Sequence, residues 1–260
     1  MANLRFPNLT PKADLSPVSS PPALKETLHF IFSRVKERLW LVGGTALAGY
    51  YAEHRRSDDL DLFAEDQETF RMTVLTVKAL QKEGAQLKNE RSSPLYYHTD
   101  VAHRGHAFTV DIVLDEYLHR LGTAVRANDG VWVADLCSLF SMKSSCLVSR
   151  CSEKDLFDLD WLIAHAENFS AAELIRLGSL MDGGLNAETL LFSLKSATLR
   201  KEACHFLLPN SPLTVNQAHQ KILDLQKFLI SAVVEYEKKL PLSENGQKIK
   251  QALKDLKKSE

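Results

Sequence analysis

The sequence lacks the features that mark secreted, zinc-binding and membrane-spanning proteins. Its four cysteines form no C-x-x-C pair and no zinc-finger spacing, so we expect a reduced chain that uses cysteine as a small core residue. No apolar run reaches the roughly 18 residues that a membrane helix needs, and no signal-peptide pattern opens the chain. The formal net charge is only -1, so any contact with nucleic acid depends on a local patch. These absences predict a cytoplasmic protein without a membrane partner.

Three regions of different character follow one another along the 260 residues. The Pro/Ser-rich run "LSPVSSPP" predicts a flexible leader over residues 1–21. Residues 22–135 mix short strand-like runs with helical spacing, which predicts a mixed β-sheet with helices on one side. Residues 136–260 have helical spacing almost throughout and predict an all-helical C-terminal domain. The expected fold class is therefore α+β.

The individual elements follow from periodicity. Helices are expected over residues 22–38, 45–51, 68–84 and 215–239, and strands over 39–44, 59–64, 84–92, 94–102 and 106–116. The apolar residues of 215–239 are typical of a core face rather than a partner groove. The final "KIKQALKDLKKSE" is rich in lysine and could touch phosphates, but we interpret it as a solvated helix face.

Two aspartates interrupt the strand "DLDLFA". Side chains two apart on a strand point the same way, so Asp59 and Asp61 share one face while Leu60 and Leu62 face a core. Two neighbouring carboxylates repel each other unless a cation lies between them, which favours a hard metal such as Mg²⁺. Taken alone, the common tripeptide Asp-Leu-Asp favours a sheet edge whose polar face is merely solvated.

The surrounding residues point to a nucleotide site. Gly43 and Gly44 end a strand just before a helix, where free backbone N–H groups suit a phosphate and Thr45 could add a hydroxyl. An ordinary strand-to-helix turn would look the same. "FTVDIVL" offers Asp111 as a third carboxylate on another strand, and we prefer it to Asp115, which lies at the strand end.

The order of two glycines, a gap, Asp-x-Asp and a later strand aspartate is similar to the nucleotidyltransferase superfamily of the DNA polymerase β type. More narrowly, "GGTAL", "HRRSDDLDLF" and "MKSSCLVSRCSEKDLFDLDWL" resemble the AbiEii/AbiGii toxin-type nucleotidyltransferases, over roughly residues 25–165. The first family signature falls on His54, Arg55, Ser57, Asp59, Asp61 and Phe63. The second falls on Lys143, Arg150, Lys154, Asp155 and Asp158.

The spacing of the residues in the second signature can also be interpreted without the family resemblance. Ser152 precedes Asp155 by three residues, as in a helix-capping box, and Asp155 and Asp158 are neighbours on one helix face. Lys143 and Arg150 share a face of the preceding helix. Spacing alone fits a salt-bridged pair of surface helices. The family resemblance favours cations that contact a triphosphate.

The resemblance implies a metal-dependent nucleotidyltransferase that moves a nucleoside monophosphate from an NTP to an acceptor hydroxyl. RNA is the implied acceptor, with tRNA first, or else the chain binds GTP tightly; a toxin–antitoxin or phage-defence role and a separate antitoxin protein go with the family. Two Mg²⁺ ions, or Mn²⁺, would be held by Asp59, Asp61 and Asp111. The other catalytic candidates are Lys143 and Asp158. The nucleotide-binding candidates are Gly43, Gly44, Thr45, Arg55, Ser57, Arg150 and Lys154.

Two other functions remain open from the sequence. A nucleotide-binding module could keep this fold and transfer nothing, although the presence of all three carboxylates argues against it. A nucleotidyltransferase or phosphotransferase of the same fold could act on a protein hydroxyl. The sequence does not separate these alternatives.

Overall fold

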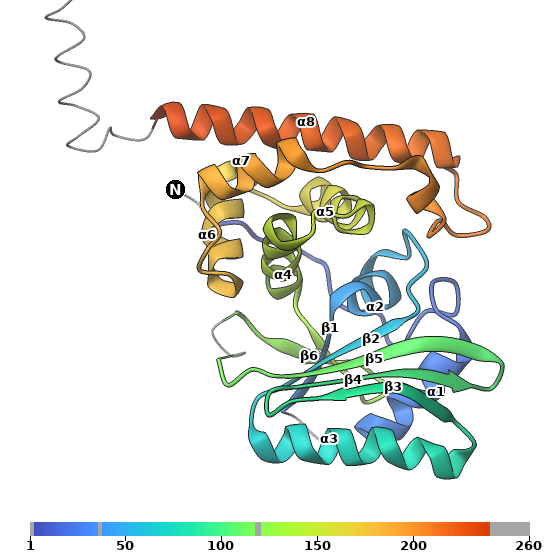
Figure 1. Cartoon of the computed structure of the whole chain (residues 1–260). Coiled ribbons are helices and arrows are strands. Elements are labelled where there is room, and N and C mark those ends of the chain that lie inside the picture. Colours follow the sequence, from blue (N-terminus) through green and yellow to red (C-terminus); the bar gives the residue numbers. More distant parts are fainter. Residues whose placement is uncertain (1–2, 36–37, 118–120, 240–260) are drawn as a thin grey trace, which may run out of the picture.

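The structure is a computed structural model that describes residues 3–35, 38–117 and 121–239. A mixed β-sheet formed by the first half of the chain is followed by helices in the second half (Figure 1). The predicted α+β fold is confirmed. The lysine-rich run at the C-terminus lies outside the described residues.

Seven strands form one sheet in the order β3-β4-β5-β2-β1-β7-β6. The strands are β1 (Leu39–Val42), β2 (Asp59–Ala64), β3 (Gln86–Ser92), β4 (Tyr96–His103), β5 (His106–Leu114), β6 (Ala124–Arg126) and β7 (Trp132–Ala134). β2 pairs in parallel with β5 and antiparallel with β1, and β1 pairs in parallel with β7. β2 is therefore a central strand with two neighbours.

One face of the sheet is covered by two helices. α1 (Pro22–Phe32) and α3 (Gln67–Ala79) lie together on this face (Figure 1). Leu60 and Leu62 are fully buried against it, because side chains alternate along β2. The prediction of helices on one side of a mixed sheet is thus confirmed, and the aspartates of β2 are left on the opposite face.

A short helix connects β1 to β2 at the sheet end. It begins as an α-helix, α2 (Gly43–Leu47), and continues as one π-helical turn, η1 (Ala48–Ala52). The turn ends at Glu53, which has a positive φ of 47°. The loop from Glu53 to β2 then carries His54, Arg55 and Ser57 back towards the aspartates.

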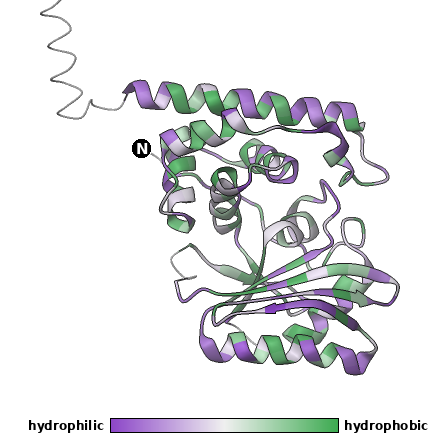
Figure 2. Cartoon of the chain, viewed as in Figure 1, coloured by the Kyte–Doolittle hydropathy of each residue, from purple (hydrophilic) through white to green (hydrophobic). Residues whose placement is uncertain are grey.

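The second half of the described chain forms a helical layer beyond the uncovered face of the sheet (Figure 1). Its helices are α4 (Leu136–Ser149), α5 (Glu153–His165), α6 (Ala171–Met181), α7 (Ala187–Ser196) and α8 (Val215–Lys239). Hydrophobic and hydrophilic residues alternate along α8 (Figure 2), and its apolar face packs on α5, α6 and α7. This confirms the expectation that α8 contributes to a core.

Residues 3–21 do not behave as the flexible leader that their composition predicts. Leu4 and Leu15 are buried, and the backbone of Arg5 pairs with Glu167 in the helical layer. The backbone N–H of Ser57, in the loop before β2, donates to the carbonyl of Ser19. The segment therefore contacts both layers and supports the loop that carries Arg55. It is held in place because its few apolar side chains are buried in the core.

The proposed division at residue 135 stays a prediction, since the two layers share contacts between α2 and α4. None of the helices in the described ranges is long and apolar enough to cross a membrane.

Candidate active site

The three predicted carboxylates lie on two adjacent strands. Asp59 and Asp61 alternate with buried leucines on β2, so both point away from the face that α1 and α3 cover. The parallel register of β2 and β5 places Asp61 directly opposite Asp111, and Asp59 opposite Thr109. Asp115 follows the end of β5 and accepts a hydrogen bond from the Tyr117 backbone. Asp111 rather than Asp115 therefore joins the pair.

Each carboxylate keeps at least one oxygen free of protein donors. Oδ1 of Asp59 accepts a hydrogen bond of 2.9 Å from the Thr109 hydroxyl. Oδ1 of Asp111 accepts one from the Tyr96 hydroxyl and lies 2.9 Å from Nδ1 of His98. Within the described residues, no donor reaches Oδ2 of either side chain or either oxygen of Asp61. These oxygens remain available to a ligand.

The environment of Asp61 disfavours its negative charge. Burial, together with the charges of Asp111 and Asp59, raises its pKa to about 6 against the opposing effect of Lys143. A carboxylate with a raised pKa beside two other carboxylates gains most from a bound cation, because the cation cancels the repulsion among them.

The donor set fits a magnesium ion in its chemistry. Carboxylate oxygens are the ligands that Mg²⁺ and Mn²⁺ prefer. In the described residues, no three His, Cys, Asp or Glu side chains already converge as a metal site. The free oxygens share one cavity, however, so side-chain rotation can bring them to an ion there. Asp59, Asp61 and Asp111 are thus the residues that would hold it.

The glycine turn shapes the site rather than simply lining it. β1 pairs with β2 so that Val42 lies opposite Asp61, and Gly43 comes next with a φ of +69°. A Cβ at Gly43 would lie 2.0 Å from Oδ2 of Asp61. A Cβ at Gly44 would lie 2.5 Å from an Arg55 nitrogen. Of the two glycines, Gly44 lines the cavity, and Gly43 makes room for Asp61.

Thr45 does not offer its hydroxyl to a phosphate, contrary to the sequence prediction. The side chain is fully buried, and its hydroxyl donates to the Asp59 carbonyl and lies 2.9 Å from Oγ of Ser57. Thr45 therefore fastens α2 to the start of β2. Ser57 lines the cavity beside Gly44.

A buried ion cluster forms the wall opposite the carboxylates. Asp158 of α5 receives two hydrogen bonds from Arg55, of 2.6 and 2.8 Å, and Nζ of Lys143 lies 2.7 Å from its Oδ2. Nε2 of His54 lies 2.8 Å from its Oδ1. Burial would raise the pKa of Asp158, but Arg55 and Lys143 hold it well below its usual range. Asp158 is fully buried and does not line the cavity, so it holds the surrounding cations in position.

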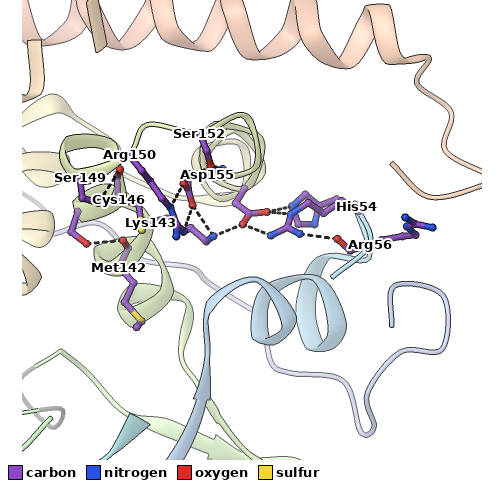
Figure 3. Close-up of polar contacts among 12 residues, drawn as sticks. His54, Arg56, Met142, Lys143, Cys146, Ser149, Arg150, Ser152 and Asp155 are labelled. Carbon is purple, nitrogen blue, oxygen red and sulfur yellow. Dashed lines mark hydrogen bonds and ion pairs between the residues drawn. The ribbon is translucent and has the colours of Figure 1, made fainter. Parts of the chain in front are cut away.

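A second aspartate of α5 continues this cluster (Figure 3). Asp155 accepts two hydrogen bonds from the Arg150 guanidinium, of 2.7 and 2.9 Å, and one of 3.1 Å from Nζ of Lys143. The Ser152 hydroxyl caps α5 by accepting from the Asp155 backbone N–H, as the capping-box spacing predicts, and it also donates to the Asp155 carboxylate. The salt bridges that spacing alone favours over contacts with a triphosphate are present: Lys143 pairs with both aspartates, and Arg150 pairs with Asp155.

Lys154 is a neighbouring cation that is not part of this ion cluster. It lies between Glu153 and Asp155 at the start of α5 and lines the cavity. Among the described residues, no carboxylate forms an ion pair with it. Its ammonium group is therefore available to an anionic ligand.

The three strand carboxylates and the cations border one cavity of about 290 Å³, the size of a small ligand site. Its lining consists of Gly44, Arg55, Ser57, Asp59, Asp61, Thr109, Asp111, Lys143, Arg150, Ser152, Lys154 and Asp155. Sequence reasoning missed Thr109, although its position two residues before Asp111 puts it on the same strand face. Carboxylates on one wall and cations on the other suit a metal-bound triphosphate.

The chain is similar to known proteins in sequence and in fold. A sequence model of the family described as "Nucleotidyl transferase AbiEii toxin, Type IV TA system" matches residues 28–225. MenT4, a nucleotidyltransferase toxin from Mycobacterium tuberculosis, is 15% identical, with 86% of this chain and 84% of that chain covered at a TM-score of 0.51, which shows a common fold. JHP933 from Helicobacter pylori is 16% identical, with 83% and 92% covered at a TM-score of 0.46. A search of curated proteins gives no match.

Proposed function

Because the chain belongs to the AbiEii family of nucleotidyl transferase toxins of type IV toxin–antitoxin systems, we propose that it transfers a nucleoside monophosphate from an NTP to a hydroxyl of RNA. tRNA is the expected acceptor. The family also implies a separate antitoxin protein as a partner. The cytoplasm, where NTPs and tRNA occur together, is the expected place of action.

The observation that carries this proposal is the division of one cavity into an anionic and a cationic wall. Asp59, Asp61 and Asp111 come from the sheet, and Lys143, Arg150 and Lys154 come from the helical layer. Mg²⁺ bound by the three carboxylates would lower the pKa of the acceptor hydroxyl and neutralise phosphate charge. Lys154 and Arg150 would bind the β- and γ-phosphates, and Gly44 lets the triphosphate approach the backbone.

The proposed transfer accounts for the bond formed, the bond broken and the proton released. The acceptor oxygen attacks the α-phosphorus, the bond from that phosphorus to the oxygen bridging the β-phosphate breaks, and pyrophosphate leaves. Tyr96 and His98 hold Oδ1 of Asp111, which leaves Oδ2 as the oxygen that would bind the metal ion. The hydroxyl gives its proton to water, because the ion would lower its pKa. Arg150 and Lys154 stabilise the charge that develops on pyrophosphate.

The test is a labelling experiment. Purified protein is incubated with Mg²⁺, total tRNA and each of the four α-labelled NTPs in turn, beside an Asp59→Ala/Asp61→Ala variant whose folding is checked by circular dichroism. Label in RNA with the wild type alone is the expected result, and the productive lane identifies the nucleotide.

Two other results would contradict the proposal. A folded wild type that labels nothing in any lane would point to a nucleotide-binding module. Label that survives ribonuclease but is lost on protease treatment would point to a protein acceptor. Replacing the NTPs by γ-labelled ones is the matched control, because a nucleotidyl transfer leaves the γ-phosphate in pyrophosphate.

A further inference from the structure

A second hollow adjoins the active-site cavity on the uncovered face of the sheet. It has a volume of about 400 Å³ and crosses β3, β4 and β5, and it shares Asp59 and Thr109 with the first cavity. Two rows of paired residues form it. The first row is Lys88, Asp100, Thr109 and Asp59, and the second is Gln86, Ala102 and Ala107. We name this hollow the sheet groove.

The groove exists because two neighbouring side chains are small. Ala102 and Ala107 face each other across β4 and β5, and both are exposed. The longer side chains of Gln86, Lys88 and Asp100 stand around them. A flat apolar floor with a polar rim suits a planar ring that carries hydrogen-bonding groups at its edge.

The strand order determines on which side of Asp59 and Asp61 the groove lies. β1 and its glycine turn lie on one side of β2, whereas β5, β4 and β3 lie on the other. Asp59 and Asp61 therefore separate the glycine turn, with Arg55 beside Gly44, from the sheet groove. In a nucleotidyl transfer the attacking oxygen and the leaving pyrophosphate lie on opposite sides of the α-phosphorus. With the triphosphate at the glycine turn, the attacking hydroxyl arrives from the groove.

From this arrangement we infer that the sheet groove binds the nucleotide of the RNA acceptor that carries the attacking hydroxyl. The base lies on Ala102 and Ala107, and Lys88 contacts a phosphate of the RNA backbone. The carboxylate of Asp100 accepts a hydrogen bond from the base, which favours a base with an exocyclic amino group. This inference rests on the proposed function, because it assumes that the reacting hydroxyl belongs to RNA.

The inference is tested with substitutions that fill the sheet groove. Ala102→Trp and Ala107→Trp each place a large side chain on the floor, and Val125→Trp on β6, 40% exposed at the far edge of the sheet, is the matched control. Each groove variant is expected to raise the KM for total tRNA about tenfold or more and to leave the dissociation constant of the NTP unchanged. The control is expected to change neither value.

Binding in the absence of turnover separates this inference from the proposed function. The groove variants are rebuilt on the Asp59→Ala/Asp61→Ala background, and total tRNA binding is measured by filter retention. Weaker binding of the groove variants supports the inference even if no nucleotide is transferred. Unchanged tRNA binding overturns it, as does a weaker NTP affinity with unchanged KM for tRNA, which would assign the groove to the base of the NTP.

Discussion

Gly43 and Asp61 are in contact across the end of the sheet, and the contact depends on the absence of a side chain at residue 43. A Cβ there would lie 2.0 Å from Oδ2 of Asp61, and the backbone has a φ of +69°. Gly43→Ala therefore has two consequences, backbone strain and displacement of a carboxylate.

We expect Gly43→Ala to lose transfer activity and Mn²⁺ binding measured by electron paramagnetic resonance. Gly84→Ala is the control, because Gly84 also has a positive φ of 87° but an added Cβ would meet nothing within 4 Å. Both variants should lose about 1–2 kcal/mol of unfolding free energy through strain. Equal Mn²⁺ binding by the two variants would show that the contact with Asp61 is not needed.

Asp158 is expected to stabilise the fold rather than contact substrate. Asp158→Asn keeps the shape but leaves Arg55 and Lys143 without a buried counter-charge. The free energy of unfolding should fall by about 3–5 kcal/mol, measured by urea denaturation. Asp160→Asn, at a half-exposed pair with Lys221 on the same helix, should change it by less than about 1 kcal/mol. Wild-type stability of Asp158→Asn would contradict the structural role.

Lys154→Ala should weaken nucleotide binding without loss of stability. The side chain lines the cavity and forms no ion pair with the described residues, so its removal leaves no buried charge behind. We expect the dissociation constant for the NTP to rise about tenfold, and less at high salt. Lys195→Ala on α7, exposed and outside the cavity, should leave it unchanged. A change of melting temperature with unchanged affinity would reject this role.

The metal-free protein should lose stability as the pH rises through the pKa of Asp61. This pKa is raised from 3.8 to about 6 in the fold, so the folded state binds the proton more tightly than the unfolded chain. The resulting stabilisation is present below about pH 4 and is lost as the pH passes 6, up to about 3 kcal/mol. Asp61→Asn should remove this loss. Urea unfolding in EDTA at several pH values compares the two, and parallel pH curves would contradict the assignment.

The N-terminal segment should be needed for stability. Leu15 is 2% exposed and lies against Gly49, where an added Cβ would come within 2.4 Å of its Cδ1. Leu15→Ala is expected to cost about 2–5 kcal/mol of unfolding free energy. Val18→Ala in the same segment is the control, since Val18 is 57% exposed. Similar stability of both variants would restore the picture of a flexible leader.

The strands and the carboxylates could be predicted because they depend on local periodicity. The two-residue alternation of β2 and β5 was enough to put Asp59, Asp61 and Asp111 on polar strand faces. The family signatures added Lys143 and Lys154. Parallel pairing of β2 with β5, which sets Asp61 opposite Asp111, agrees with the expected mixed sheet.

The features that could not be predicted from the sequence depend on contacts between residues that are distant along the chain. The roles of Thr45 and Asp158 changed once their partners were known, because Thr45 bonds to β2 and Asp158 is enclosed by Arg55, Lys143 and His54. Composition alone could not show that Leu15 is buried. The sheet groove likewise requires that Ala102 and Ala107 meet across two strands, which follows from hairpin register rather than from either residue.

The position of α5 along the chain has a consequence for biosynthesis. The carboxylates lie on strands that end at Leu114, but Lys154, Asp155 and Asp158 belong to a helix that begins at Glu153. Because ribosomes make proteins from the N-terminus, the strands emerge first, while Arg55 and Lys143 still lack their anions. A fragment that ends before α5 therefore contains Lys143 and Arg150 but lacks Lys154 and the two aspartates that hold these cations in place. The cationic wall is therefore complete only after α5 has been synthesised.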